Sequence, residues 1–322
     1  MKLLVTGAAG FIGSNYARNV LRQDIGVDKL VILDKLTYAG TLENIVDLLE
    51  YNTVELIVGD ISDASTVEKA ITGVDYVINF AAESHVDRSI SSSKEFIESN
   101  ILGVGNLLDY SRKAGIKTFV QVSTDEVYGS VDQGESKEFD PLLPNSPYAA
   151  SKASADLIVR SYVQTYGMDV RITRCVNNYG PYQNPEKFLP KAITNLLDGK
   201  KVPIYGTGKN VREWIHVSDH VNAITDVMLR GAQGEIYNVG SGYRISNLEL
   251  AHKLLDVMNL KTDRLEFVED RLGHDNRYAL SSEKIRSELY CPPTDVNSFE
   301  DNLSELVNWY DNNQNWWRAR NK

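Results

Sequence analysis

Gly7-Ala8-Ala9-Gly10-Phe11-Ile12-Gly13 follows, after one threonine, the apolar run Leu3-Leu4-Val5. Glycines at this spacing let the backbone turn tightly and approach a pyrophosphate, and the N-terminus of the next helix offers N–H groups and a positive dipole end. Apolar residues at helical spacing continue after the turn, so a strand, a glycine turn and a helix occur in succession. This order is typical of a dinucleotide-binding unit, although a glycine turn alone also occurs in ordinary strand-to-helix connections.

A second strand-like run, Lys29-Leu30-Val31-Ile32-Leu33, ends in Asp34, which lies 21 residues after Gly13. A carboxylate at this position accepts hydrogen bonds from the ribose of NAD and repels the 2′-phosphate of NADP. We therefore predict NAD as the cofactor. The alternative is an ordinary turn with a solvated Asp34, and the matching order of strand, turn, helix and acid disfavours it.

Further strand-like runs alternate with helical segments, at 54–58, 76–80, 118–122 and 170–173. Strands that are mostly apolar on both faces and alternate with helices predict an α/β fold with a doubly wound parallel sheet of the Rossmann type. Beyond Cys175 the loops become rich in proline, glycine and asparagine. We predict an NAD-binding Rossmann domain over 1–175, to which later segments can return, and a smaller C-terminal substrate-binding region over 176–322.

The composition of the chain restricts the kinds of partner that we expect it to bind. The net charge of −10 argues against nucleic acid or an anionic membrane as the main partner, and we expect a small-molecule substrate. Cys175 and Cys291 are too far apart in sequence to suggest a disulfide framework, which fits a cytoplasmic protein. His216 and His220 have helical spacing but lack a third ligand, so we expect no metal. We expect the C-terminal aromatic residues 309–317 to pack a helix.

Tyr148 and Lys152 lie four residues apart, behind Ser146 and Pro147, which are typical of a helix start. The two side chains therefore share a helix face. A phenol is a poor base at neutral pH, but a nearby ammonium group and the positive nicotinamide ring stabilise its phenolate form. This arrangement suits removal of a proton from an alcohol during its oxidation. A surface tyrosine beside a solvated lysine is the alternative, and the nucleotide turn disfavours it.

The glycine turn with Tyr148 and Lys152 resembles the extended short-chain dehydrogenase/reductase superfamily. Five further segments resemble the dTDP-glucose 4,6-dehydratase family, and the match extends from residue 2 to about 317: Asp34-Lys35-Leu36-Thr37-Tyr38-Ala39-Gly40, Ala81-Ala82-Glu83-Ser84-His85-Val86-Asp87, Ser123-Thr124-Asp125-Glu126-Val127-Tyr128-Gly129, Asn177-Asn178-Tyr179-Gly180-Pro181-Tyr182-Gln183 and Asp270-Arg271-Leu272-Gly273-His274-Asp275. The Thr-Asp-Glu triplet is the most specific segment. The chain departs from the family pattern at Ser99, Val176, Thr207 and Ser241.

The resemblance implies a hydro-lyase that converts dTDP-glucose to dTDP-4-keto-6-deoxyglucose and water. Oxidation at C4 makes the C5 proton acidic, water leaves across C5 and C6, and the hydride returns to C6. In this reading Tyr148 is the base for C4 oxidation and Thr124 positions the 4-hydroxyl. Glu126 takes the C5 proton and Asp125 protonates the departing hydroxyl. Two neighbouring carboxyl groups can act as base and acid in this way when their pKa values differ.

The resemblance also implies the binding residues. The expected NAD contacts are Gly7, Gly10, Phe11, Ile12, Gly13, Asp34, Lys35, Thr37, Asp60, Ile61, Ala81, Ala82, Ser99, Tyr148, Lys152 and Asn178. The expected contacts of the sugar nucleotide are Ser84, Thr124, Asn177, Glu186, Lys187, Pro203, Tyr205, Arg212, Asn247, Arg271 and His274. The family further suggests a homodimer packed through two helices of each subunit. The alternatives are another short-chain sugar-nucleotide enzyme, such as a UDP-sugar dehydratase or a 4-epimerase, and a catalytically silent NAD-binding regulator.

Overall fold

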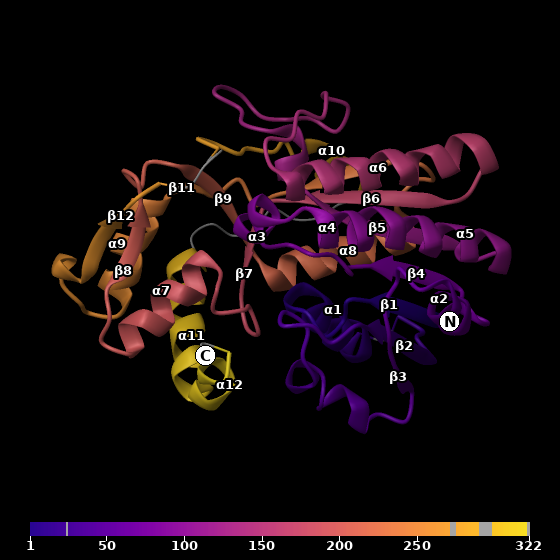
Figure 1. The fold of residues 1–322 in the computed structure, drawn as a ribbon, viewed down its shortest axis with the longest axis horizontal. Helices are drawn as coiled ribbons and strands as arrows, with labels where there is room; N and C mark the ends of the chain where they lie inside the picture. The colour runs from indigo at the N-terminus through magenta and orange to yellow at the C-terminus, as the bar shows by residue number, and fades with distance from the viewer. Residues whose placement is uncertain (24, 271–274, 290–297, 321–322) are drawn as a thin grey trace.

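A seven-stranded parallel sheet forms the centre of the computed structural model, which describes residues 1–23, 25–270, 275–289 and 298–320. The strand order is β10-β6-β5-β4-β1-β2-β3 (Figure 1). The strands are β1 (Lys2–Thr6), β2 (Lys29–Asp34), β3 (Val54–Val58), β4 (Tyr76–Asn79), β5 (Thr118–Thr124), β6 (Val170–Cys175) and β10 (Ile236–Val239). The predicted Rossmann-type sheet is confirmed.

Helices cover both faces of this sheet, because alternate residues of each strand point to opposite faces. On β1, Leu3 and Val5 pack with α1 (Phe11–Arg22) and α8 (Val217–Arg230). Leu4 packs on the other face with α2 (Ala64–Ile71), α5 (Val104–Ala114) and α6 (Pro147–Tyr166). Short helical segments α3 (Val86–Ser91), α4 (Lys94–Ile97) and η3 (Glu98–Gly103) lead into α5.

The chain reverses direction in the sheet at β1. It runs outward from β1 to β2 and β3, and then returns to place β4 on the other side of β1. Ligands of doubly wound sheets bind at such a reversal, beyond the carboxyl ends of the strands. The segments that leave β1 and β4 there are the glycine turn and the segment that begins at Ala81.

A smaller region with its own core lies beyond these carboxyl ends and occupies the left of Figure 1. Its strands form a three-stranded sheet, β11-β9-β7, and a two-stranded sheet, β12-β8. They are β7 (Asn177–Tyr179), β8 (Val202–Tyr205), β9 (Val211–His216), β11 (Arg244–Ser246) and β12 (Leu265–Val268). The helices of this region are α7 (Phe188–Leu197), α9 (Asn247–Val257), α11 (Phe299–Asn312) and α12 (Gln314–Arg318).

Two segments beyond residue 176, α8 and β10, return to the large sheet. β10 pairs with β6 in parallel, and α8 packs against α1. α10 (Glu283–Leu289) lies against β10, and the remaining turns are the 3₁₀ segments η1 (Leu42–Asn44), η2 (Leu48–Glu50), η4 (Asp125–Tyr128) and η5 (Thr262–Arg264). In the part of the chain described, no helix is both long enough and apolar enough to cross a membrane.

Candidate active site

A cavity of about 570 Å³ lies between the large sheet and the smaller region, at the carboxyl ends of the strands. All the predicted catalytic and binding residues within the described ranges line it, although they come from distant parts of the chain. Arg271 and His274 lie outside the described residues. Further lining residues were missed by the sequence analysis, and they include Cys175, Trp214 and Tyr278. Trp214 follows the predicted Arg212 at a spacing of two, the period of a strand, which is a signal that could have found it.

The glycine turn is shaped for close contact. Gly7 has a φ of +69°, and a Cβ atom on it would lie 2.5 Å from the amide nitrogen of Ala81. A Cβ atom on Gly13 would lie 2.3 Å from the carbonyl oxygen of Gly7. Gly10 precedes the first residue of α1 and has no side chain that could cover the first amides of the helix. These amides therefore suit a diphosphate.

Asp34 is tied to the same turn. Its Oδ2 accepts the Ala9 N–H at 2.8 Å, and its Oδ1 accepts the Leu36 N–H at 2.8 Å. Burial raises the pKa of this carboxyl, and the two amides oppose that shift. Because a carboxylate oxygen can accept more than one hydrogen bond, both oxygens retain capacity for ribose hydroxyls. The turn and Asp34 together fit a dinucleotide with a free 2′-hydroxyl.

The Thr-Asp-Glu triplet lies where β5 ends and η4 begins. Thr124 Oγ1 accepts the Glu126 N–H at 3.3 Å and donates to Asp125 Oδ1 at 3.1 Å. Asp125 is buried, and among the described residues its Oδ2 has no hydrogen-bond partner. Burial, followed by the neighbouring Glu126 carboxylate, raises the pKa of Asp125 well above its ordinary value. Asp125 is therefore disposed to hold a proton, as an acid requires.

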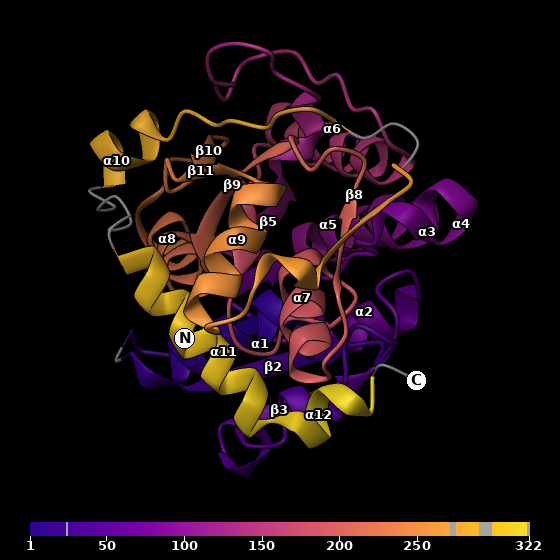
Figure 2. The same cartoon turned by 90° about the vertical axis from the view of Figure 1, so that its left-hand side faces the viewer.

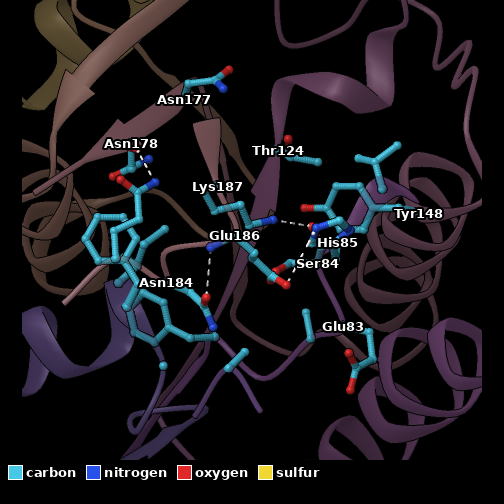
Figure 3. Close-up of a pocket in the computed structure, with 18 of the residues that line it drawn as sticks. Glu83, Ser84, His85, Thr124, Tyr148, Asn177, Asn178, Asn184, Glu186 and Lys187 are labelled. Carbon is cyan, nitrogen blue, oxygen red and sulfur yellow. Dashed lines mark hydrogen bonds and ion pairs between the residues drawn. The ribbon is translucent and has the colours of Figure 1, made fainter. Parts of the chain in front are cut away.

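Tyr148 lies in the first turn of α6, where Ser146 Oγ accepts the Ala149 N–H at 3.1 Å and caps the helix. Its ring and Thr124 face the cavity from neighbouring elements (Figure 3). Burial raises the pKa of the Tyr148 phenol well above 10, the Glu126 charge adds to this, and a hydrogen bond with Thr124 lowers it. This phenol therefore needs a positive charge beside it to act as a base near neutral pH.

Lys152 is held by the sheet. Its Nζ donates to the carbonyl oxygen of Val122 on β5 at 2.7 Å. Burial lowers the pKa of this ammonium group, and Asp156, one helical turn further along α6, opposes the shift. Cys175 lines the same cavity, and burial raises the pKa of its thiol to about 12. The thiol is therefore neutral.

Basic side chains line the part of the cavity that the smaller region covers. Lys187 Nζ donates to the Ser84 carbonyl oxygen at 2.8 Å, as the dashed line in Figure 3 shows. Arg212 donates to the Asp275 carbonyl oxygen at 2.9 Å and lies over the Tyr278 ring. Glu186 lies 3.6 Å from His85 Nε2. Arg212 and Lys187 suit the phosphates of an anionic substrate.

The histidine pair has structural contacts. His216 Nδ1 accepts the Ser218 N–H at 3.3 Å and caps α8. His220 Nδ1 lies 2.9 Å from Asn178 Oδ1, and burial lowers the pKa of His220 to about 3, so it stays neutral and donates from Nδ1. Within the described ranges, no cluster of His, Cys, Asp and Glu side chains is arranged to hold a metal ion.

The departures from the family pattern fall in different surroundings. Val176 is buried and lines the cavity, as does Ser99. Ser241 Oγ donates to the Trp214 carbonyl oxygen at 2.6 Å, so it supports the cavity wall from behind. Thr207 is exposed and lies outside the cavity lining. None of the four replaces a proposed acid or base.

Comparison with known proteins places this arrangement in a family. The model of the GDP-mannose 4,6 dehydratase family matches residues 4–301. A dTDP-glucose 4,6-dehydratase from Streptomyces antibioticus is 48% identical over 100% of this chain and 96% of its own length. The crystal structure of DesIV, a dTDP-glucose 4,6-dehydratase from Streptomyces venezuelae with NAD and TYD bound, superposes with a TM-score of 0.97 at 49% identity, covering 99% of this chain and 100% of that one.

A dTDP-glucose 4,6-dehydratase from Bacillus anthracis, in complex with NAD, superposes with a TM-score of 0.92 at 41% identity, covering 99% of each chain. These matches extend over both the large sheet and the smaller region, and so include every element that lines the cavity. The chain therefore belongs to the dTDP-glucose 4,6-dehydratases, a family of the extended short-chain dehydrogenase/reductase superfamily.

Proposed function

We propose that this chain is an NAD-dependent hydro-lyase that converts dTDP-glucose to dTDP-4-keto-6-deoxyglucose and water. The observation that carries the proposal is the meeting of the Thr124-Asp125-Glu126 triplet with Tyr148 in one cavity, next to a dinucleotide turn. A 4-epimerase needs only the oxidation machinery. An acid with a raised pKa beside a second carboxyl group is what elimination of water needs.

Tyr148 removes the proton of the 4-hydroxyl, which Thr124 holds by a hydrogen bond. Bound NAD supplies the hydride acceptor for C4 and returns the hydride to C6, so that the net redox change is zero. Lys152, fixed to the Val122 carbonyl, places its positive charge near the phenol and favours the phenolate form. The resulting 4-keto group makes the proton on C5 acidic.

Glu126 takes the C5 proton, and the electron pair of the C5–H bond forms a double bond to C6 as the C6–O bond breaks. Asp125 gives its proton to the departing hydroxyl, which leaves as water. Glu126 then returns its proton to C5 when the hydride reaches C6. Tyr148 releases to solvent the proton that it took from the 4-hydroxyl, and Asp125 regains a proton from solvent. In the described residues Asp125 Oδ2 has no partner, and a hydroxyl on C6 would provide one.

The same proposal assigns the remaining contacts. Asp34 and the glycine turn bind NAD, and Arg212 and Lys187 bind the diphosphate of the substrate. The division into a nucleotide-binding part, 1–175 together with the returning segments, and a substrate-binding part is consistent with the positions of these groups. Arg271 and His274 stay predicted substrate contacts.

We also propose a homodimer. Large apolar side chains are exposed on the adjoining segments α4, η3 and α6: Ile97 at 51%, Leu102 at 53% and Leu157 at 57%. Apolar side chains gathered on neighbouring helices favour association with a second copy. A cytoplasmic location suits the buried free thiol of Cys175.

Incubation of the purified protein with dTDP-, UDP- and GDP-hexoses tests the function, with products identified by mass and NMR. The proposal expects loss of one water from dTDP-glucose and a 4-keto-6-deoxy sugar as the product. A product of unchanged mass with inverted C4 would identify a 4-epimerase. Preference for a UDP-sugar would identify a UDP-sugar dehydratase. Binding of NAD without turnover of any sugar nucleotide would identify the silent regulator.

A further inference from the structure

The loop that leaves β2 is contacted by the C-terminal helix α12 and by Arg320, which lies two residues after that helix. We call residues 37–47 the β2 loop. The indole N–H of Trp316 donates to Asn44 Oδ1 at 2.8 Å, across 272 residues of sequence. The guanidinium group of Arg320 hydrogen-bonds Thr41 Oγ1 and lies 3.3 Å from Glu43. Figure 2 shows α12 after α11 at the lower edge of the molecule.

The contact continues from Asn44 into the glycine turn. Asn44 is 1% exposed, and its Nδ2 donates to the carbonyl oxygen of Ala9 at 2.7 Å. The Thr41 N–H donates to the same carbonyl oxygen at 3.2 Å. The N–H of Ala9 in turn donates to Asp34 Oδ2 at 2.8 Å. One series of hydrogen bonds therefore connects the C-terminal helix to the carboxylate proposed to hold the ribose.

The β2 loop also touches Asp34 and the cavity directly. A Cβ atom on Gly40 would lie 2.8 Å from Asp34 Oδ1, so the backbone of the loop lies against this carboxylate. Thr37, Ala39 and Gly40 line the cavity. A shift of the loop would therefore alter both the setting of Asp34 and the wall around a bound dinucleotide.

A second group of contacts fixes the loop where it meets α1. Arg18 donates to the Asn44 carbonyl oxygen at 2.6 Å and pairs with Asp47. Its guanidinium group lies 4.1 Å from the centre of the Tyr182 ring, and that ring lies edge-on to Trp316. The loop is therefore held between α1 and the C-terminal helix.

We infer that Trp316, Asn44 and Arg320 form a latch that holds the β2 loop against the glycine turn and so slows the release of NAD. This inference rests on the proposed NAD site. The three are positioning residues, since they act on the dinucleotide through the Ala9 carbonyl and the loop. The aromatic residues at the end of the chain thus have a role in addition to packing.

We expect substitutions in the latch to weaken the binding of NAD while the turnover rate at saturating NAD stays nearly constant. Trp316→Phe keeps the aromatic ring and removes the indole N–H, and the loss of one hydrogen bond corresponds to about 2–10-fold weaker NAD binding. Asn44→Ala removes the bonds to both Ala9 and Trp316, so a larger loss is expected. At saturating NAD, kcat with dTDP-glucose should stay within about twofold for Trp316→Phe, because the catalytic groups are untouched.

Arg318→Ala is the matched control for Arg320→Ala. Arg318 is the last residue of α12, two positions before Arg320, but it pairs with Asp198, at the end of α7, at 2.7 Å. The experiment measures the NAD dissociation constant by calorimetry, the NAD release rate by stopped flow, and hydrogen exchange of the β2 loop, residues 37–47, without NAD. Melting curves confirm that each variant is folded.

Weaker NAD binding and faster exchange of the loop in Trp316→Phe and Arg320→Ala, with wild-type values in Arg318→Ala, would support the latch. Wild-type NAD affinity in Trp316→Phe and Arg320→Ala would overturn it and leave the proposed function intact. An equal loss in Arg318→Ala would also overturn it, because a general weakening of the C-terminal region would then explain the effect. If the wild-type protein binds no NAD, the proposed function fails together with the latch.

Discussion

The ends of the cavity that we propose bind the sugar and the phosphates differ in how many hydrogen bonds their polar groups already make. At the sugar end Asp125 and Tyr148 are buried with raised pKa values, and in the described residues Asp125 Oδ2 lacks a partner. At the phosphate end Lys187 and Arg212 already donate to backbone carbonyls. The reacting groups therefore carry an energetic cost that substrate contacts can relieve, whereas the binding groups are held in place beforehand. Substitutions at the first end should change rates, and those at the second should change affinity.

The largest expected effect is that of Tyr148→Phe at the sugar end. Removal of the phenol removes the proton acceptor for the 4-hydroxyl, and losses of a general base are typically about 10²–10⁴-fold. Phenylalanine keeps the ring contact with Phe96, so the variant should still fold and bind NAD. Nicotinamide absorbance after mixing with dTDP-glucose reports the oxidation step. A wild-type absorbance change in the variant would assign the base to another group.

Glu126→Gln and Asp125→Asn should separate dehydration from oxidation. Both variants should still reduce the nicotinamide and then stall at the 4-keto sugar, with turnover lowered by about 10²–10⁴-fold. Exchange of the C5 proton in deuterium oxide should stop in Glu126→Gln and persist in part in Asp125→Asn, because only the base forms the carbanion. Rapid-quench mass spectrometry measures both. If neither variant reduces the nicotinamide, the two carboxyl groups serve binding or the hydride step instead.

Arg212→Ala tests the phosphate end. Loss of a hydrogen bond to a charged group costs about 1.5–3 kcal/mol, which is roughly a 10–100-fold increase in KM for the sugar nucleotide. We expect a much smaller change in kcat. Lys209→Ala is the control, because Lys209 is exposed on the same segment and outside the cavity lining. Steady-state kinetics would contradict the contrast between the two ends if kcat fell as far as KM rose.

The smallest expected effect is on stability. The pKa of Asp125 is raised in the folded protein, so its carboxyl favours the protonated form there. Its contribution to stability is complete below the unfolded value of about 3.9 and is lost as pH rises through the folded pKa. Asp125→Asn keeps a neutral group at all pH values. At pH 7 it should therefore unfold with a free energy about 1–3 kcal/mol higher than that of the wild type.

Urea unfolding at several pH values measures this difference, which should shrink toward pH 4. A variant less stable than the wild type at pH 7 would show that the folded protein stabilises the Asp125 carboxyl group, contrary to this expectation. A more stable but inactive variant would illustrate the cost of holding a buried acid ready for catalysis.

Local apolar patterns predicted six of the seven strands of the large sheet, whereas β10 (Ile236–Val239) was not among the predicted runs. The run at 118–122 is an instructive exception, since β5 continues to Thr124. Ser123 and Thr124 are polar, but both are buried and pair with Arg174 and Cys175 on β6. Tertiary pairing extended this strand beyond its apolar part.

The cavity lining was also predictable where it follows strand ends or family motifs, whereas partners distant in sequence were not. Lys152 was expected to lower the pKa of Tyr148, and nothing in the sequence showed that its Nζ would be held by the Val122 carbonyl. The bond from Trp316 to Asn44 likewise joins two segments 272 residues apart, and no periodicity in the sequence aligns them. Such contacts depend on the assembled fold.

The return of α8 and β10 to the large sheet has a consequence for synthesis of the protein. Tyr16 on α1 is fully buried, and its hydroxyl lies 3.6 Å from the sulfur of Met228 on α8. A nascent chain that has emerged only to residue 175 contains the glycine turn, Tyr148 and Lys152, yet the face of α1 that packs against α8 is still open to water. Completion of the nucleotide-binding half must wait until about residue 239 leaves the ribosome, by which time much of the smaller region has been translated. The two halves are therefore committed to folding together, and a fragment cut at 175 should aggregate.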